Sequence, residues 1–291
     1  SCLVLSTYFQ RYYIDVGFAL KPFMLLLPIA AMVYLVPGVK LLTRIYSYEK
    51  CFLAFVFYSV CRGCFSADVV SALRLSLGFA LLIFFYFIVS NLVYRTPYEK
   101  IEKILVFSSI LFLLFSLLTY IAGNGWIMDR GIKRLTGLIK GPNHFVIWAA
   151  PSYILSLSMI GNSGLRLRRR CLYLLVFLLS LTCIALTASR GGILATSLGT
   201  VLFLVSPRVG KGYNKTGVVL LLLISLTVLY LLAVYGLKID VLGIIAKRMS
   251  DSGGSGRVRI WTNAFRILRR YPFVGIGLYN FQYYNLHLFD D

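Results

Sequence analysis

The chain has 291 residues, of which 59% are hydrophobic, and its 30 Lys and Arg residues outweigh 10 Asp and Glu to give a net charge of +20. Soluble domains are rarely more than about half apolar, so this composition excludes an ordinary soluble protein. The charge would suggest nucleic acid in a soluble protein. Here the cationic residues lie between apolar runs, so phosphate groups of membrane lipids are the expected partners and nucleic acid is not.

Continuous apolar runs of up to about 20 residues recur along the chain, which is the length that crosses a bilayer as a helix. They do not alternate as barrel strands would, so the predicted fold class is an all-α, polytopic helical membrane protein. We expect about eight transmembrane helices, at Val16–Val36, Cys51–Cys64, Leu73–Val93, Ile104–Ala122, His144–Ile160, Cys171–Ala188, Gly192–Ser206 and Gly217–Tyr235.

Lys and Arg in the connections predict the orientation. One set of loops, at 37–50, 94–103, 162–170 and 207–216, carries these residues at roughly twice the density of the other set. The run Arg166 to Arg170 is the strongest of these topology determinants. The raw count is similar for both sets, but long loops count little in this rule. The denser set is therefore predicted to be cytoplasmic, which places Arg134, Arg190 and Arg257 together outside the cytoplasm.

The predicted organisation is a transmembrane bundle at 1–235 followed by the start of a large loop outside the cytoplasm at 236–291. In that loop, Ile260, Ala264, Phe265 and Leu268 recur at helical spacing and predict an amphipathic helix over 257–270, ended by Pro272. Gly275 and Gly277 predict a turn after it. Both ends of the chain look cut, so we expect a fragment of a longer protein.

Arg190 has an unusual position, in Thr187-Ala188-Ser189-Arg190-Gly191-Gly192 between two apolar runs with almost no loop. An arginine at this depth costs about 2.5 kcal/mol or more unless it is paired. Few acids lie on the same predicted side, so a phosphate is the expected partner. The two glycines would let a ligand or another backbone approach closely.

Three separated segments of the chain match the motifs of one family. They are Arg134-Leu135-Thr136-Gly137 with Gly141-Pro142-Asn143, then Thr187 to Gly192, then Gly256 to Phe281. In this order, and on one predicted face, they resemble the O-antigen ligase and O-antigen polymerase superfamily of bacterial envelope enzymes. The part of the chain that carries the family's core is expected at about 143–291. The family usually has about a dozen spans and a large periplasmic loop, so the resemblance implies that this chain is a fragment of a roughly twelve-helix protein and that its loop at 236–291 is periplasmic.

The resemblance implies a glycosyltransferase of the bacterial inner membrane, acting in O-antigen and lipopolysaccharide biosynthesis. Such enzymes transfer a glycan from undecaprenyl pyrophosphate to an acceptor hydroxyl outside the cytoplasm. The acceptor is lipid A core in a ligase and a growing lipid-linked chain in a polymerase, and both alternatives stay open. The implied catalytic residues are Arg190 and Arg257, and the implied substrate-binding residues are Arg134, Asn143, Arg259 and Trp261.

Arginine binds phosphate bidentately and can stabilise a leaving pyrophosphate, so no metal and no other cofactor is expected. The chain has no D-x-D element, and its outer acids form no obvious ligand set. Trp261 is equally compatible with stacking on a sugar and with anchoring at the membrane surface. The tyrosines Tyr279, Tyr283 and Tyr284 allow the same two interpretations.

The family also carries a histidine in the large loop, proposed to activate the acceptor. This chain has only His144 and His287, and neither has the family's context. We therefore expect that histidine beyond Asp291, and the chain as given to be inactive. A Cys61-x-x-Cys64 pair is interpreted as packing rather than redox chemistry, because no thioredoxin-like context surrounds it.

The alternative function is a transporter or flippase of polyprenyl-linked glycans, which would also need cations near phosphates. Transporters tend to place ionisable residues at mid-span and to show internal repeats. Neither feature is evident here, so chemistry at the membrane surface is favoured.

Overall fold

The computed structural model describes residues 14–15, 19–20, 47–129, 131–139, 141–206, 213–231 and 257–289. In these ranges the chain forms nine helices and two short two-stranded hairpins, so the predicted helical class is confirmed. The elements divide into two compact units. Unit 1 is Ser1–Ala30 with Pro97–Ile244, and unit 2 is Ala31–Thr96 with Ile245–Asp291.

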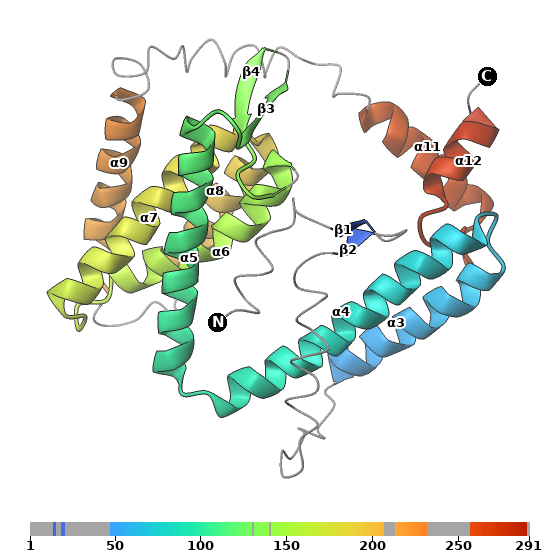
Figure 1. Cartoon of the computed structure of the whole chain (residues 1–291), viewed down its shortest axis with the longest axis horizontal. Coiled ribbons are helices and arrows are strands. Elements are labelled where there is room, and N and C mark those ends of the chain that lie inside the picture. Colours follow the sequence, from blue (N-terminus) through green and yellow to red (C-terminus); the bar gives the residue numbers. More distant parts are fainter. Residues whose placement is uncertain are drawn as a thin grey trace. The chain divides into compact units, whose positions relative to one another are not determined.

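Unit 1 is a bundle of helices with a hairpin at one end (Figure 1). Helix α6 packs along α7, while α5 packs on α7 and α8 packs on α6. The elements are β1 (Ile14–Asp15), β2 (Ala19–Leu20), α5 (Tyr98–Ile121), β3 (Trp126–Asp129), β4 (Ile132–Leu135), α6 (Pro142–Ile160), α7 (Leu167–Thr187), α8 (Arg190–Val205) and α9 (Lys215–Leu231).

The core of unit 1 combines stacked aromatic rings with small polar residues. Phe112 of α5 stacks on Phe145 of α6 with ring centroids 5.0 Å apart. Hydrogen bonds join Ser109 to Ser152 at 2.7 Å and Tyr153 to Thr200 at 3.0 Å, each between two helices. Lipid tails are as apolar as leucine, so close packing and such bonds, each about 0.6 kcal/mol, hold membrane helices together.

The helix ends of unit 1 fall into two groups. At one end, the end of α7 and the starts of α6 and α8 meet the β3–β4 hairpin through the bonds of Arg134 and Asn143. At the other end, the backbone of Asn214 before α9 donates to Gly161 after α6, at 2.9 Å. Asn162 and Tyr213, which form a bridge at this end, belong to two loops that the charge pattern also grouped together.

Unit 2 contains a hairpin of two helices and the segment 257–289, which follows α9 in sequence. Its helices are α3 (Ser47–Cys64), α4 (Val69–Arg95), α11 (Arg257–Arg270) and α12 (Phe281–Phe289). Asp68 caps α4 by accepting from the Ser71 N–H at 3.0 Å. The hydrogen bonds from Ser71 lower the pKa of the Asp68 carboxyl, so it is ionised at neutral pH. Asn263 of α11 donates to Asn285 of α12 at 2.8 Å.

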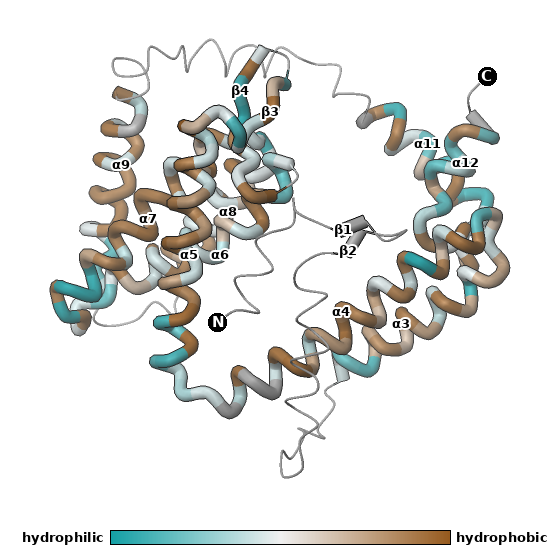
Figure 2. The backbone as a smooth tube through the Cα atoms, viewed as in Figure 1, coloured by the Kyte–Doolittle hydropathy of each residue, from teal (hydrophilic) through white to brown (hydrophobic). Residues whose placement is uncertain are grey.

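Within the described ranges, three helices are long and apolar enough to cross a membrane: Val69–Ser90 in α4, Tyr98–Ile121, which is α5, and Leu167–Thr187, which is α7. Figure 2 shows their hydrophobic residues and the hydrophilic ends of the bundle. At 1.5 Å per residue, the 24 residues of α5 span about 36 Å, against about 30 Å of hydrocarbon. Helix α8 has 16 residues and α9 has 17, so they count only as shorter apolar helices.

The predicted count of about eight spans is thus not confirmed. Helix α3 is 18 residues long but carries Glu49, Lys50 and Arg62, and it is not among the candidate spans. Helix α6 opens with Pro142-Asn143-His144, which lowers its hydropathy. In the predicted first span, Ala19 and Leu20 form strand β2, and the rest of that span lies outside the described residues.

The β3–β4 hairpin is a feature that the sequence prediction missed. Asp129 pairs with Ile132, and Gly131 in the turn has a φ of +77°, a conformation that favours glycine. Asp-x-Gly after the apolar pair Ile127-Met128 is a turn signal, but each strand has only four residues. The hairpin carries Arg134 to the end of the bundle.

Candidate functional site: an arginine-rich end of the helix bundle

Arg134 of β4 is almost fully buried, with 7% of its surface exposed. Its Nε donates to the carbonyl oxygen of Thr187 at 2.8 Å, its Nη1 to the Asp129 carboxylate at 2.6 Å, and its Nη2 to the Asn143 amide oxygen at 3.2 Å. The Thr187 carbonyl is the last of α7 and has no partner within the helix. Arg134 therefore ties the hairpin to the end of α7 and the start of α6.

The turn between α7 and α8 has a geometry that its sequence explains. Ala188 ends α7 in the left-handed conformation, with a φ of 47°, and Ser189 then caps α8. The Ser189 hydroxyl accepts from the Gly192 N–H at 3.2 Å and donates to the Asn143 amide oxygen at 2.9 Å. This reversal within two residues is what allows an arginine to stand between two apolar helices with almost no loop.

The two glycines after Arg190 have different surroundings. A Cβ on Gly192 would lie 2.6 Å from a methyl group of Val146, so the start of α8 sits against α6 where only glycine fits. A Cβ on Gly191 would meet no atom within 4 Å. The sequence analysis expected a ligand or another backbone beside these glycines, whereas the group close to Gly192 is the Val146 side chain of α6. The space beside Gly191 is open.

Asn143 brings two helix starts together. It lies in the first turn of α6, and its amide oxygen accepts from both Arg134 and Ser189. The first N–H groups of a helix have no partners within the helix and carry a partial positive charge. The starts of α6 and α8 are joined at this point, so their positive ends reinforce each other. Neither helix has an acidic residue in its first turn.

Arg190 is the first residue of α8, and its side chain is exposed. It is followed in sequence by Gly191, where an added Cβ would meet no atom within 4 Å. Unlike Arg134, it lies at the surface of unit 1. The structure brings together three predicted site residues, Arg134, Asn143 and Arg190, and their chemistry suits an anion with several oxygens.

The other predicted site residues lie in unit 2, on α11. A helix occupies 257–270 as predicted. Its side chains fall into a buried group, an exposed apolar group and exposed arginines. Asn263 and Ile267 are buried, while the apolar residues Val258, Trp261, Phe265 and Leu268 are all at least 56% exposed. Arg259, Arg266, Arg269 and Arg270 are exposed beside this apolar stripe. Arg257 is the first residue of the helix, as predicted.

Trp261 belongs to the exposed apolar stripe. It lines a shallow hollow with Val258, Thr262 and Phe265, all from the same helix. Residues three and four apart on a helix share a face, so this stripe is one continuous surface. An exposed apolar stripe beside arginines matches the pattern of helices that lie in a membrane surface.

The segment after α11 docks on the turn between α3 and α4. Arg62 donates from Nε and Nη2 to the Gly275 carbonyl oxygen at 3.2 and 3.0 Å. Asn280, fully buried, accepts from the Asp68 N–H at 2.8 Å. Gly275 and Gly277 have φ values of +61° and +85°, which confirms the predicted glycine turn. This family motif is therefore part of a packed structure with the α3–α4 hairpin.

The remaining candidate residues have local roles. His287 of α12 is exposed and stacks on Tyr283 with centroids 4.1 Å apart, and His144 is exposed at the start of α6. Cys61 and Cys64 are exposed and not joined in a disulfide. Among the residues that the structure describes, no three of His, Cys, Asp and Glu lie close enough to hold a metal ion.

Sequence reasoning missed Asp129, Ser189, Arg62 and Asn280. Ser189 had a detectable signal, because serine before a helix is a common N-cap. Arg62 and Asn280 had none, since each reaches a partner more than 200 residues away in sequence. Only the folded chain shows these contacts.

The apolar helices and the cationic end of the bundle define a helical membrane protein. Residues 175–290 match the family described as O-Antigen ligase. This match confirms the resemblance to the O-antigen ligase and polymerase superfamily, and it covers the Ser189-Arg190-Gly191 turn and the segment after Gly256. No curated protein and no solved structure matches the chain.

Proposed function

We propose that this protein is a glycosyltransferase of cell-envelope polysaccharide synthesis. Its donor is a glycan on undecaprenyl pyrophosphate, and its acceptor is a hydroxyl of lipid A core or of another lipid-linked chain. The observation that carries the proposal is the junction of α6 and α8, where Ser189 and Asn143 join two helix starts next to the exposed Arg190, and where a Cβ on Gly191 would meet no atom within 4 Å. The junction lies at one end of an apolar bundle, where a lipid pyrophosphate could reach it.

The proposed chemistry follows from charge development. When the acceptor oxygen attacks the sugar, the bond between sugar and phosphate breaks and the pyrophosphate keeps the electron pair. Arg190 and the N–H groups at the start of α8 stabilise this growing negative charge. Arg134 and Asn143 hold the two helix starts in place, and Arg134 thus contributes through its buried hydrogen bonds.

Arg257, Arg259 and Trp261 remain part of the proposal on the strength of the family motif. Arg257 lies at the start of α11, where a helix again favours an anion. The exposed apolar stripe favours the membrane-anchoring interpretation of Trp261 over sugar stacking.

The test is transfer in liposomes that contain the full-length protein, a polyprenyl-pyrophosphate glycan and an acceptor lipid. Transfer that continues in excess EDTA is the expected result, because arginines neutralise the leaving group. Movement of the donor lipid across the bilayer with no new glycosidic bond would instead support the transporter alternative. Loss of transfer on chelation, restored by magnesium, would contradict the proposed metal independence.

A further inference from the structure

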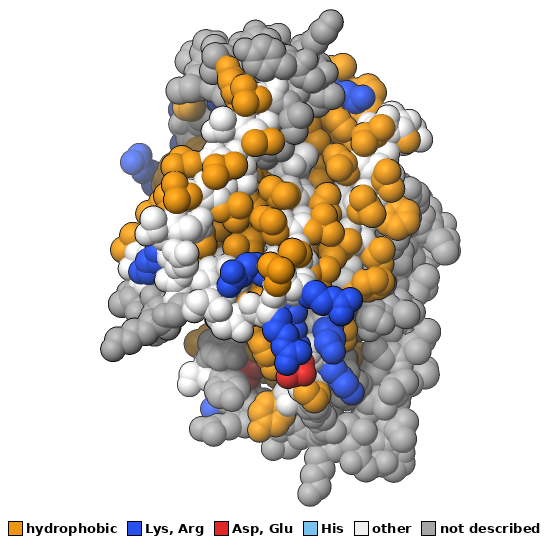
Figure 3. Space-filling model, turned by 90° about the vertical axis from the view of Figure 1, so that its left-hand side faces the viewer, with side chains coloured by type: hydrophobic (Ala, Val, Ile, Leu, Met, Phe, Trp, Pro, Cys, Tyr) orange, Lys and Arg blue, Asp and Glu red, His pale blue; other side chains and the backbone are white. Residues whose placement is uncertain are grey.

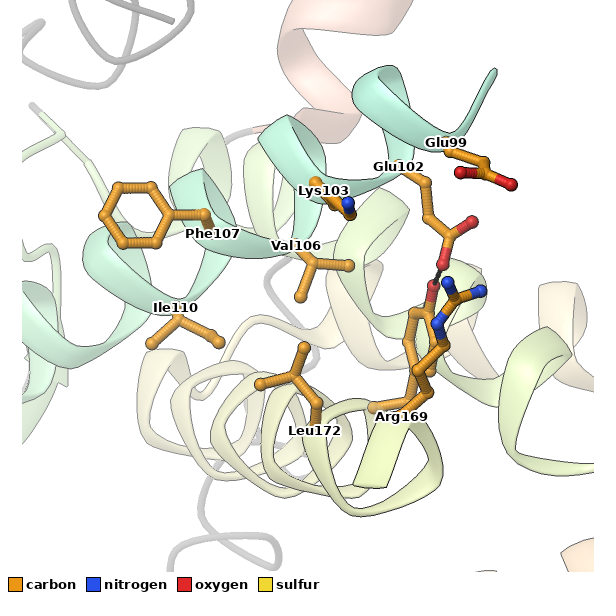
Figure 4. Close-up of a pocket in the computed structure, with 9 residues that line it drawn as sticks. Glu99, Glu102, Lys103, Val106, Phe107, Ile110, Arg169 and Leu172 are labelled. Atoms are coloured by element: carbon orange, nitrogen blue, oxygen red, sulfur yellow. Dashed lines mark hydrogen bonds between the residues drawn. The ribbon is translucent and has the colours of Figure 1, made fainter. Parts of the chain in front are cut away.

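A second polar site lies in unit 1, at the end where α5 and α7 begin. A cavity of about 200 Å³ is lined by the N-terminal parts of these two helices (Figure 4). The charged lining residues are Glu99, Glu102, Lys103 and Arg169. Figure 4 shows Glu99, Glu102 and Arg169 toward one side, Lys103 and Val106 in the middle, and Phe107 and Ile110 toward the other side.

The carboxylates of this cavity are partly fixed by the fold. The buried Tyr173 hydroxyl donates to Glu102, which holds that carboxylate at the cavity wall. Glu99 is exposed in the first turn of α5, one turn away from Glu102 on the same helix face. Lys103 lines the same cavity four residues after Glu99, and the two carboxylates still offer several acceptor oxygens to an ammonium group.

The start of α7 offers the opposite charge. Arg166, Arg168 and Arg169 are exposed there, and the first turn of α7 has no acid and no side-chain cap. Cations near a helix start are unfavourable unless an anion joins them. Arg170 donates to the Asn162 carbonyl oxygen at 3.0 Å. Arg169 lines the cavity, so it can direct an anion toward the side where the carboxylates lie.

The rest of the cavity is apolar. Val106, Phe107, Ile110 and Leu172 form its lining along two helices that are apolar and long enough to cross a membrane. Figure 3 shows apolar side chains over one face of the molecule, with Lys and Arg gathered toward an edge. A ligand of this site therefore needs an anionic group, a cationic group and a hydrocarbon chain.

We propose that this cavity binds a phospholipid whose headgroup joins a phosphodiester to a primary ammonium. The ammonium lies between Glu99 and Glu102 and donates hydrogen bonds to both carboxylates. Arg169 and the start of α7 bind the phosphodiester, and one acyl chain lies against Phe107 and Ile110. This site is separate from the Arg190 junction and does not depend on the proposed transfer reaction.

The test is native mass spectrometry of the full-length protein with phosphatidylethanolamine, phosphatidylcholine and phosphatidylglycerol of identical acyl chains. Phosphatidylethanolamine is expected to be retained about tenfold more than phosphatidylcholine, whose quaternary nitrogen cannot donate hydrogen bonds. Glu99→Gln and Glu102→Gln should each remove this preference. Lys100→Gln, in the same turn but outside the cavity lining, should keep it.

Glu102→Gln alters the partner of Tyr173, so its thermal stability is measured alongside. If that variant is unstable, exposed Glu99 alone decides the result. Equal retention of the choline and ethanolamine lipids would overturn the proposal. Preferential retention of phosphatidylglycerol, lost only in Arg169→Ala, would also overturn it, because the arginines alone would then select an anionic lipid.

Discussion

Arg134 and Arg190 show how one residue type takes two roles at the candidate site. Arg134 is buried and uses its guanidinium on three acceptors of the protein, while Arg190 is exposed at the start of α8. The sequence indicated both residues through the same family resemblance. It could not separate them, because the acceptors of Arg134 come from three different elements.

Arg190→Ala is expected to lower transfer by about 10²-fold or more, the usual effect of removing a group that stabilises charge in a transition state. Arg190→Lys should also be poor, since a point charge does not reproduce a bidentate guanidinium. Transfer in liposomes is the measurement, with membrane insertion as the control. A lysine variant with wild-type transfer would show that Arg190 does not clamp the pyrophosphate.

Gly191 and Gly192 offer a matched pair of alanine variants at neighbouring positions. Gly192→Ala should destabilise the protein by about 1–3 kcal/mol, because the added methyl meets Val146. Gly191→Ala should leave stability unchanged, since its methyl meets no atom within 4 Å, but should weaken donor binding. Thermal unfolding and the KM for the donor separate the two effects. Unchanged KM in Gly191→Ala would argue against a ligand beside that glycine.

At the scale of elements, α11 and the glycine turn after it were predicted with the correct bounds. Arginine and apolar residues repeat at helical spacing there, and Pro272 follows the last turn. These signals are local, so the sequence alone is enough to predict the helix and the turn. The docking of the turn on the α3–α4 hairpin is not local and could not be predicted.

Arg62→Ala should release the glycine turn from the α3–α4 hairpin. Hydrogen bonds to a charged group contribute about 1.5–3 kcal/mol, so amides of 272–278 should exchange roughly tenfold to a hundredfold faster. Hydrogen exchange in nanodiscs measures this. Arg74→Ala, an exposed arginine of α4, serves as the control. Equal exchange in both variants would mean that Arg62 does not hold the turn.

The arginines of α11 are expected to have different roles that depend on their position in the helix. We predict that Arg257→Ala removes most transfer, because Arg257 stands at the helix start, where an anion is favoured. The double variant Arg269→Ala, Arg270→Ala should mainly weaken membrane association, since these residues are exposed near the apolar stripe. Liposome flotation and transfer assays compare them. Equal, modest losses in both would remove Arg257 from the catalytic assignment.

For the whole molecule, hydropathy predicted the class and most helix positions, while its count of about eight membrane spans is not confirmed. Helices α3, α6, α8 and α9 lie in predicted spans but are not among the three candidate spans of the described residues. Helix α3 carries three charges, while α8 and α9 have only 16 and 17 residues. A helix of 16 residues reaches about 24 Å, short of the hydrocarbon thickness. Hydropathy alone does not distinguish such a helix from a full span, because its ends are set by caps and turns.

The predicted orientation of the bundle decides on which side of the membrane the site can act. The loops 94–103, 162–170 and 207–216 hold the denser Lys and Arg, so they should face the cytoplasm, and the segment 257–289 should face the periplasm. In a cysteine-free background, Gln282→Cys should react with a membrane-impermeant maleimide in cells whose inner membrane is intact. Gly164→Cys should react only after that membrane is permeabilised. Both side chains would be exposed, since residues 164 and 282 lie at the surface. The reverse pattern would put Arg190 on the cytoplasmic side, where an acceptor outside the membrane could not reach it, and the proposed transfer would then have to be abandoned.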